Sequence, residues 1–392
     1  MKVAGRVEFL TKSETQEIND RAQELKRKGK DLVDLGAGEP RFSEPETARS
    51  AGKEAIKDGY TGYTEVGGNH NLKGAIMKRY ERIFGVDTSN LAVISTVGAK
   101  SALFEITQLL YEKGDEVILP KPYWVSYSAQ VRLAGGKPVY AKGEPENHYL
   151  PTAGDIESKI TPATRGILIN SPANPSGGVY NEKQSRDIVD LAREHELFLV
   201  GDECYDGFVY EKDRFWTLAS SDYEGVMVVG STSKNFAMTG WRLGYILGRT
   251  RYINELENIQ SHFTSSPPAI SQKAGEAAFR DELTLSRNLR EEFKLKREFL
   301  AGELSELPGI NCSPPPGSFY LLPDVREALT DLGYENDEDG KLARFFLEEA
   351  GVVTVPGSAF GCPGHLRLAY LPDKVRLEEA IERIEKTVRN SG

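Results

Sequence analysis

The stretch VMVVGSTSKNFAMTGWRLGYIL, residues 226–247, has a short apolar run at each end and a polar loop between them. The runs at 226–229 and 245–247 have the composition and length of buried strands. Within the loop, Lys234 lies between two small hydroxyl residues and a glycine-bracketed Trp-Arg pair. A lysine ammonium is usually a solvated surface charge, so its place directly after an expected strand indicates a chemical role.

The same alternation of elements continues through the chain from about Leu91. Short β-branched runs alternate with helical stretches such as residues 181–194, whose apolar residues cluster at helical spacing. This pattern predicts an α/β fold with a mostly parallel seven-stranded sheet that has helices on both faces. The seven expected strands are residues 92–95, 115–119, 137–140, 166–170, 197–200, 226–229 and 245–247.

After Pro268 the alternation stops. Residues 271–306 carry one long helical pattern that ends before Pro308, and we expect this helix to lead into a smaller α+β lobe. The elements expected in that lobe are strands within 318–322, 352–355 and 365–370, a helix over 342–351 and a final charged amphipathic helix.

Composition excludes several classes of protein. The 392-residue chain has no apolar run long enough to span a bilayer and no apolar signal-peptide core at its start, so we expect a cytoplasmic protein without membrane contact. A formal net charge of -10 without a basic run disfavours nucleic acid. Three widely separated cysteines and five histidines without paired ligand spacing predict neither a disulfide framework nor a metal site.

Four of the expected strands are followed by unusual polar or glycine-containing sequences. They are GDECY at 201–205, STSK at 231–234, SPANPSG at 171–177, and VGAK at 97–100, which opens a helix. Ligands of open α/β sheets bind beyond the carboxyl ends of the strands. We therefore expect these segments to converge on one site.

Each of these segments resembles a motif of the class I and II aminotransferases, which are pyridoxal-phosphate enzymes of fold type I. The resemblance runs over nearly the whole chain and is closest to the bacterial and archaeal branch of aspartate aminotransferases. It implies an N-terminal arm with part of the small domain at 1–45, a large cofactor-binding domain at 46–295 and a small domain at 296–392. The matching motifs, in the family's order, are DLGAGEP, YTEVGGNHNL, PYWVSY, NSPANPSGG, GDECY, STSKNFAMTGWRLGY, PGSFYLL and HLRLAY.

The family's chemistry explains the central residue types. A lysine amine attacks an aldehyde only when it is neutral, and Lys234 is the residue expected to form a Schiff base with pyridoxal phosphate and to move the substrate α-proton. Asp202 directly follows a buried strand and is expected to pair with the pyridinium nitrogen, although it could instead cap a helix. By resemblance, Tyr205 and Asn174 bind the cofactor's phenolic oxygen and Trp124 stacks on its ring.

The phosphate and the substrate have expected partners of their own. Backbone amides at a helix start, hydroxyls and a guanidinium suit a phosphate. By resemblance, a tyrosine reaches the phosphate from the neighbouring subunit, which implies a homodimer with shared sites. The residues expected at the phosphate are Gly98, Ala99, Lys100, Ser231, Ser233, Arg242 and Tyr63. The residues expected at the substrate are Arg367, Asn174 and Gly38 for the α-carboxylate, and Lys100, Thr15 and Trp124 for its other parts.

Several alternatives remain open from the sequence. Arg367 could be a plain solvent-facing residue of a half-buried strand. Lys100 favours aspartate and glutamate as donors with 2-oxoglutarate as acceptor, but Glu65 could weaken this preference and admit aromatic or prephenate-type substrates. A lyase on the same fold would carry nearly identical motifs. A cofactor-binding regulator would need a basic DNA-binding module, and the motifs here begin too near Met1 for us to expect one.

Overall fold

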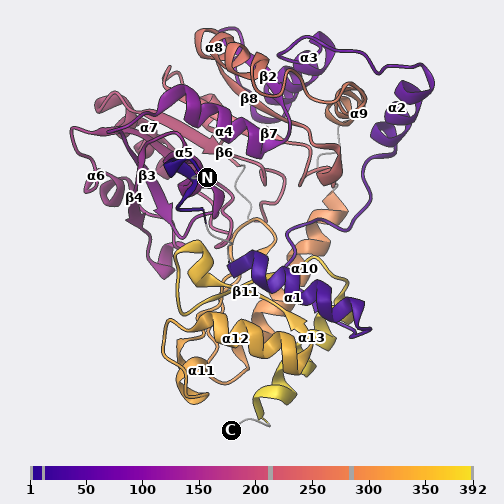
Figure 1. Ribbon diagram of the computed structural model, residues 1–392, viewed down its shortest axis with the longest axis vertical. Helices are drawn as coiled ribbons and strands as arrows, with labels where there is room; N and C mark the ends of the chain where they lie inside the picture. The colour runs from indigo at the N-terminus through magenta and orange to yellow at the C-terminus, as the bar shows by residue number, and fades with distance from the viewer. Residues whose placement is uncertain (1–2, 11–13, 211–214, 282–286, 390–392) are drawn as a thin grey trace.

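The computed structural model describes residues 3–10, 14–210, 215–281 and 287–389 of the chain. In Figure 1 a large sheet with its helices occupies the upper part, and a second group of helices and short strands lies below it. The long helix α10 (Arg287–Ser305) runs between the two groups. Within the described residues, no helix is long and apolar enough to cross a membrane.

The large sheet contains all seven expected strands, in the order β2-β8-β7-β6-β5-β3-β4. Only β8 runs antiparallel to its neighbours, so the prediction of a mostly parallel α/β sheet is confirmed. The strands are β2 (Leu91–Thr96), β3 (Glu116–Lys121), β4 (Lys137–Lys142), β5 (Thr164–Asn170), β6 (Phe198–Asp202), β7 (Val226–Ser231) and β8 (Gly244–Arg249).

Helices cover both faces of this sheet because each presents one apolar stripe to it. One buried cluster joins sheet residues to α4 (Ala99–Leu110), α5 (Ser126–Leu133) and α8 (Thr250–Ser261). A second cluster on the opposite face includes α3 (His70–Arg79), α6 (Ala153–Glu157), α7 (Glu182–Glu194) and α9 (Ala269–Arg280), and α2 (Glu46–Lys57) packs on α9. Where α3 ends, the chain continues as a π-helical turn, Tyr80–Phe84.

The expected single helix over 271–306 is wrong. The chain forms two helices, and Asp281 between them leaves the helical region with φ −67° and ψ 126°. The carboxylate of Asp281 accepts a hydrogen bond from Thr47 Oγ1 of α2 at 2.8 Å. A tertiary contact thus stabilises Asp281 at the point where the helical pattern of residues 271–306 is interrupted.

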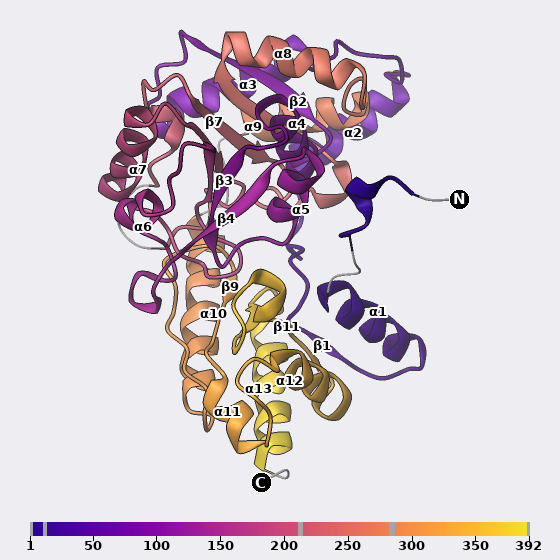
Figure 2. The same ribbon diagram turned by 60° about the vertical axis from the view of Figure 1, so that its left-hand side comes forward.

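The second lobe has its own core and two small sheets. The antiparallel sheet has the order β11-β12-β9, and β1 pairs in parallel with β10, so residues before 45 contribute to this lobe. In Figure 2, α1 (Glu14–Arg27) lies beside this group, where it contacts β11 and α12. The remaining elements are β1 (Val33–Asp34), β9 (Tyr320–Leu321), α11 (Arg326–Asp331), α12 (Asp339–Phe345), β10 (Val352–Val353), β11 (Val355–Pro356), β12 (Leu366–Ala369) and α13 (Lys374–Arg389).

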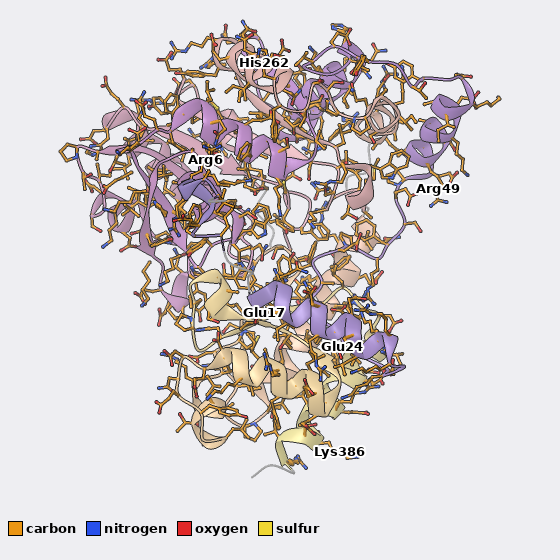
Figure 3. The ribbon with its side chains drawn as sticks, in the orientation of Figure 1. Arg6, Glu17, Glu24, Arg49, His262 and Lys386 are labelled. Carbon is orange, nitrogen blue, oxygen red and sulfur yellow. The ribbon has the colours of Figure 1, made fainter. Side chains whose placement is uncertain are left out.

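Polar side chains project outward from the helices of both groups. Among the side chains labelled in Figure 3, those of Glu17 on α1, His262 at the end of α8 and Lys386 on α13 are exposed. The apolar faces of the same helices pack inward, as amphipathic surface helices do. The expected strands and helices of the second lobe are present, while the domain boundaries at 45/46 and 295/296 stay a prediction.

Candidate active site

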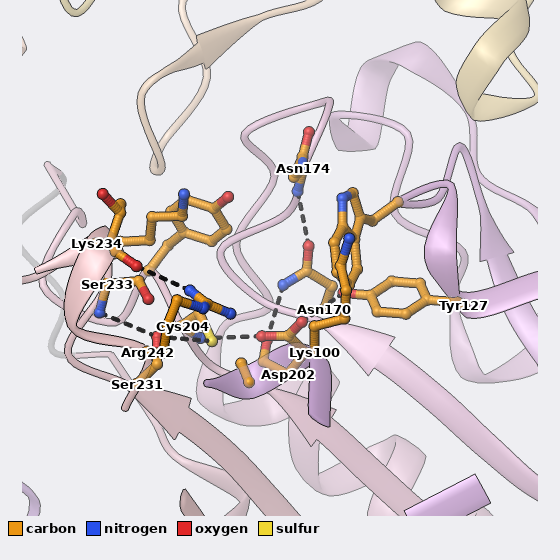
Figure 4. A pocket seen from close by; sticks show the side chains of 14 residues that line it. Lys100, Tyr127, Asn170, Asn174, Asp202, Cys204, Ser231, Ser233, Lys234 and Arg242 are labelled. Carbon is orange, nitrogen blue, oxygen red and sulfur yellow. Dashed lines mark hydrogen bonds between the residues drawn. The ribbon is translucent and has the colours of Figure 1, made fainter. Parts of the chain in front are cut away.

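A cavity of about 260 Å³ lies at the carboxyl ends of β5, β6 and β7, next to the start of α4 (Figure 4). This is the position at which open α/β sheets bind ligands. Most of the residues expected from the sequence meet here. The cavity is lined by Ala99, Lys100, Trp124, Tyr127, Asn170, Asn174, Asp202, Cys204, Tyr205, Ser231, Ser233, Lys234, Thr239 and Arg242.

Asp202, the last residue of β6, is only 5% exposed and is held by two donors. Tyr127 Oη donates to Oδ2 at 2.7 Å, and the Cys204 backbone N–H donates to Oδ1 at 3.1 Å. Burial raises the pKa of the Asp202 carboxyl above its ordinary value despite these hydrogen bonds. The side chain lines the cavity, and among the described residues no helix begins directly after Asp202, so the alternative of a helix cap is wrong.

An asparagine pair fixes the neighbouring strand end. Asn170 Nδ2 donates to the Asp202 carbonyl oxygen at 2.8 Å, and Asn170 Oδ1 accepts from the Asn174 N–H at 2.7 Å. These bonds hold the segment after β5 against the segment after β6. Asn174 is thereby placed at the cavity with its own side chain turned toward the second lobe.

Tyr205 lies three residues beyond Asp202 and is buried. Its Oη lies 3.2 Å from Tyr320 Oη, a residue of β9, so this hydrogen bond joins the large sheet to the second lobe. Burial raises the pKa of the Tyr205 hydroxyl, which is therefore neutral and able to donate.

Lys234 follows β7, and its Nζ donates to the Gly38 carbonyl oxygen at 2.6 Å. Gly38 was expected to offer its N–H to the substrate, whereas here its carbonyl group serves the lysine. A Cβ at Gly38 would collide with Tyr320 Oη, so the close approach requires glycine.

The cavity gathers three cations, Lys100, Lys234 and Arg242. Partial burial, and then the positive charges of Arg242 and Lys234, lower the pKa of the Lys100 ammonium. Lys100 Nζ also lies 4.9 Å from the centre of the Trp124 ring, a distance suited to a cation–π contact. Such a group of like charges is a binding site for an anion.

The start of α4 adds backbone donors to this positive cavity. Gly98 is the N-cap of α4 with φ 78°, and a Cβ there would lie 2.5 Å from Arg242 Nη2. Glycine therefore lets the guanidinium approach the helix start, where the dipole favours negative charge. Ser231 Oγ accepts from the Ser233 N–H at 3.3 Å, so the two serines form one turn beside the lysine.

Arg367, on β12, is 6% exposed, and the alternative of a solvent-facing arginine is wrong. Nη1 donates to Asn174 Oδ1 at 3.0 Å, and Nη2 donates to the Gly36 carbonyl oxygen at 2.6 Å. Because Asn174 lines the cavity, Arg367 stands at its edge. Its Nε has no hydrogen-bond partner within the described part of the chain.

Several expected residues do not line the cavity. Gly38, Gly98 and Arg367 lie behind its wall, next to Lys234, Arg242 and Asn174. Tyr63 is 96% exposed, and Glu65 is also exposed in the single chain. Thr15 belongs to α1, but its side chain lies outside the described part of the structure. Four cavity residues were not predicted, namely Tyr127, Asn170, Cys204 and Thr239. Tyr127 ends the quoted PYWVSY motif and Asn170 ends an expected strand, so both could have been found by position.

The charges in the cavity fit pyridoxal phosphate. The three cations, the two serines and the start of α4 suit a phosphate group. The buried Asp202 carboxylate, whose pKa is raised by burial, suits a cationic ring nitrogen that would pair with it. The residues present thus match both ends of this cofactor.

Comparisons with known proteins identify the family of the chain. A family model described as aminotransferase class I and II matches residues 30–384. The chain is 39% identical over 391 residues to an aspartate aminotransferase of Bacillus subtilis (strain 168), with 99% of each chain covered. It is 36% identical over 392 residues to an aspartate/prephenate aminotransferase of Nitrosomonas europaea, covering 98% of this chain and 99% of that protein. The aspartate aminotransferase structure from Rhizobium meliloti matches with a TM-score of 0.91 at 35% identity, covering 100% of each chain.

Proposed function

This chain belongs to the class I and II aminotransferase family, and we propose that it transfers the amino group of aspartate or glutamate to a 2-oxo acid such as 2-oxoglutarate. Enzymes of this family use pyridoxal phosphate. The observation that carries the proposal is the cavity itself, in which two further cations, Lys100 and Arg242, and one buried carboxylate lie around a lysine at a strand end. A relative named aspartate aminotransferase at 39% identity supports the choice of donor.

When bound, pyridoxal phosphate would supply an aldehyde for covalent attachment and an aromatic ring that withdraws electrons from the substrate α-carbon. Asp202 would pair with the ring nitrogen and keep it protonated. Tyr205 and Asn174 would bind the phenolic oxygen, and Trp124 would lie against the ring. The phosphate would be held by Ser231, Ser233, Arg242 and the backbone of Gly98, Ala99 and Lys100.

Lys234 would perform two tasks in succession. Its Nζ would hold the cofactor, and as a free amine it would take the proton from the substrate Cα. Both tasks need a neutral lysine amine. The Gly38 carbonyl oxygen, which accepts from Nζ at 2.6 Å, gives the freed amine a defined position.

Two cations would recognise the carboxylates of a dicarboxylic substrate. Arg367, next to the cavity residue Asn174, can bind the α-carboxylate, since Nη1 and Nη2 each carry a second N–H besides the one donated to Asn174 or Gly36. Lys100 is the candidate for the distal carboxylate. Carboxylates at both ends of the substrate would explain why the cavity carries more positive charge than the phosphate alone requires.

The function would require two copies of the chain. Tyr63 is 96% exposed and so cannot serve the cavity of its own chain as it stands. Phe263 is 54% exposed and lies near the same loop, where Tyr60, Gly62 and Ser265 line a shallow groove. We infer a homodimer in which Tyr63 of one chain reaches the phosphate site of the other.

A panel of amino donors with 2-oxoglutarate as the fixed acceptor tests the proposal. Formation of glutamate from aspartate, with a kcat/KM above that for any other donor, is the expected result. A preference for phenylalanine as donor, or for a prephenate-type acceptor with aspartate as donor, is the second candidate, favoured by the relative named aspartate/prephenate aminotransferase. Absence of transfer from every donor would contradict both.

A further inference from the structure

Two loops carry the residues proposed to act on the cofactor. The loop after β6 carries Tyr205, and the loop after β7 carries Lys234. The residue directly after Tyr205 is Asp206, and the residue directly after Lys234 is Asn235. Both are polar and almost fully buried, at 7% and 5% exposure. Neither Asp206 nor Asn235 lines the cavity. Their burial beside the site needs its own explanation.

The two residues are joined to each other and to helix α3. Asn235 Nδ2 donates to Asp206 Oδ1, and Asn235 Oδ1 accepts from the Gly207 N–H at 3.1 Å. Arg79, the last residue of α3 and 3% exposed, donates through Nη2 to Asp206 Oδ2 at 2.8 Å. The Arg79 guanidinium carbon also lies 5.1 Å from the ring centre of Phe84.

Stability alone does not explain this group. A buried ion pair recovers little more than its desolvation cost, and well-packed apolar residues often serve as well. Here the cost is increased, because Arg79 Nε and Nη1 are buried without a hydrogen-bond partner among the described residues. Directional hydrogen bonds, unlike apolar packing, fix the relative position of the segments that they join.

We propose that Arg79, Asp206 and Asn235 are positioning residues that hold the Tyr205 and Lys234 loops in one register. The inference rests on the proposed function, since it concerns the residues assigned to the transfer reaction. Asp206 is covalently next to Tyr205 and Asn235 is next to Lys234, so a shift in their hydrogen bonds moves both side chains. Reaction rates fall steeply when reacting groups are misplaced by about 1 Å.

The test compares Asn235→Ala with Asn181→Ala, a control that removes the side-chain cap of α7 far from the cavity. For Asn235→Ala we expect kcat to fall about tenfold to a hundredfold while KM for the amino donor changes less than about threefold. The visible absorption of the bound cofactor is also followed across a pH titration, because it reports the proton on the Lys234 nitrogen. The midpoint pH of this titration should differ between Asn235→Ala and wild type. Asn181→Ala should leave both readouts as in wild type.

A third readout uses the protein without cofactor. Backbone hydrogen exchange over residues 203–208 and 234–238 should be faster in Asn235→Ala than in wild type, and unchanged in Asn181→Ala. Arg79→Lys is the second variant, for use if Asn235→Ala folds poorly. It keeps the charge but loses the planar, forked guanidinium, and it should change kcat, the spectral midpoint and hydrogen exchange in the same direction but less.

Wild-type transfer activity is measured first, so failure of the proposed function is seen separately. If the wild type is active, the inference would be overturned by variants Asn235→Ala and Arg79→Lys that both keep the kcat and the spectral midpoint of the wild type. It would also be overturned if Asn181→Ala and Asn235→Ala lost activity equally.

Discussion

The cavity at the ends of β5, β6 and β7 and the exposed loop that carries Tyr63 contrast in how they are built. The sheet brings the strand ends together within one chain, because parallel strands present their carboxyl ends at one edge. The loop has no such support, and Tyr63 points away from the body of its own chain. A motif at a strand end therefore predicts where its side chains lie in the fold. A motif in a loop predicts which residue takes part but not where its side chain lies.

The largest effect is expected when the side chain of Lys234 is removed from the cavity. Lys234→Ala should lower kcat by about 10⁴-fold or more, because one residue serves as nucleophile and base. Borohydride reduction of the wild-type protein with pyridoxal phosphate, followed by peptide mapping, should label Lys234. Lys57→Ala on the exposed face of α2 is the control and should keep full activity. A label on another lysine would contradict the assignment.

The next effect concerns the buried carboxylate. Asp202→Asn keeps the volume but removes the charge, and the rate of the half-reaction with aspartate should fall about 10²- to 10³-fold in stopped-flow measurements. A near-normal rate would show that the carboxylate serves the fold alone.

The same variant has a stability signature in the protein without cofactor. Burial raises the pKa of Asp202, so the folded chain binds this proton more tightly than the unfolded chain does. The free energy of unfolding of wild type then falls as the pH rises above the ordinary aspartate range. Asp202→Asn should lack this contribution in urea unfolding at a series of pH values. Identical pH dependence in both proteins would contradict the burial argument.

A smaller effect is expected at the edge of the cavity. Lys100→Ala should lower kcat/KM for aspartate by roughly tenfold to a hundredfold, the value of a hydrogen bond between charged groups, and should spare phenylalanine. Equal losses for both donors would mean that Lys100 serves the cofactor or the fold, and the preference for dicarboxylates would have to be abandoned.

The smallest effect tests the exposed loop. Tyr63→Phe removes one hydroxyl, and the affinity for pyridoxal phosphate should fall about fivefold in equilibrium dialysis, which corresponds to about 1 kcal/mol. Sedimentation should show a dimer in wild type and variant alike. A monomeric protein with full activity would remove the basis for a shared site.

The sequence was most informative where local pattern and tertiary structure agree. The seven strands were found because apolar runs such as 226–229 are buried on both faces of the sheet. The break at Asp281 could not be found, since its partner Thr47 is 234 residues away in the chain.

The same limit applies to the site. The position of Lys234 follows from its strand, but the burial of Arg367 depends on Asn174 and Gly36, which come from distant segments. The bonds of Tyr127 and Asn235 are likewise tertiary, and neither residue stands out in its motif by composition.

Arg367 is fixed before any substrate arrives, by two hydrogen bonds and by the rings of Tyr320 and Phe360 at 4.5 and 4.8 Å. Binding a carboxylate there costs little rotamer freedom, whereas ordering a mobile side chain costs about 0.5 to 1.5 kcal/mol. Every amino acid carries the carboxylate that Arg367 would meet, so this saving is common to all donors. On the proposed function, discrimination among donors would then depend on the less restrained Lys100, and exchange of that one residue would retune substrate choice while the shared anchor stays intact.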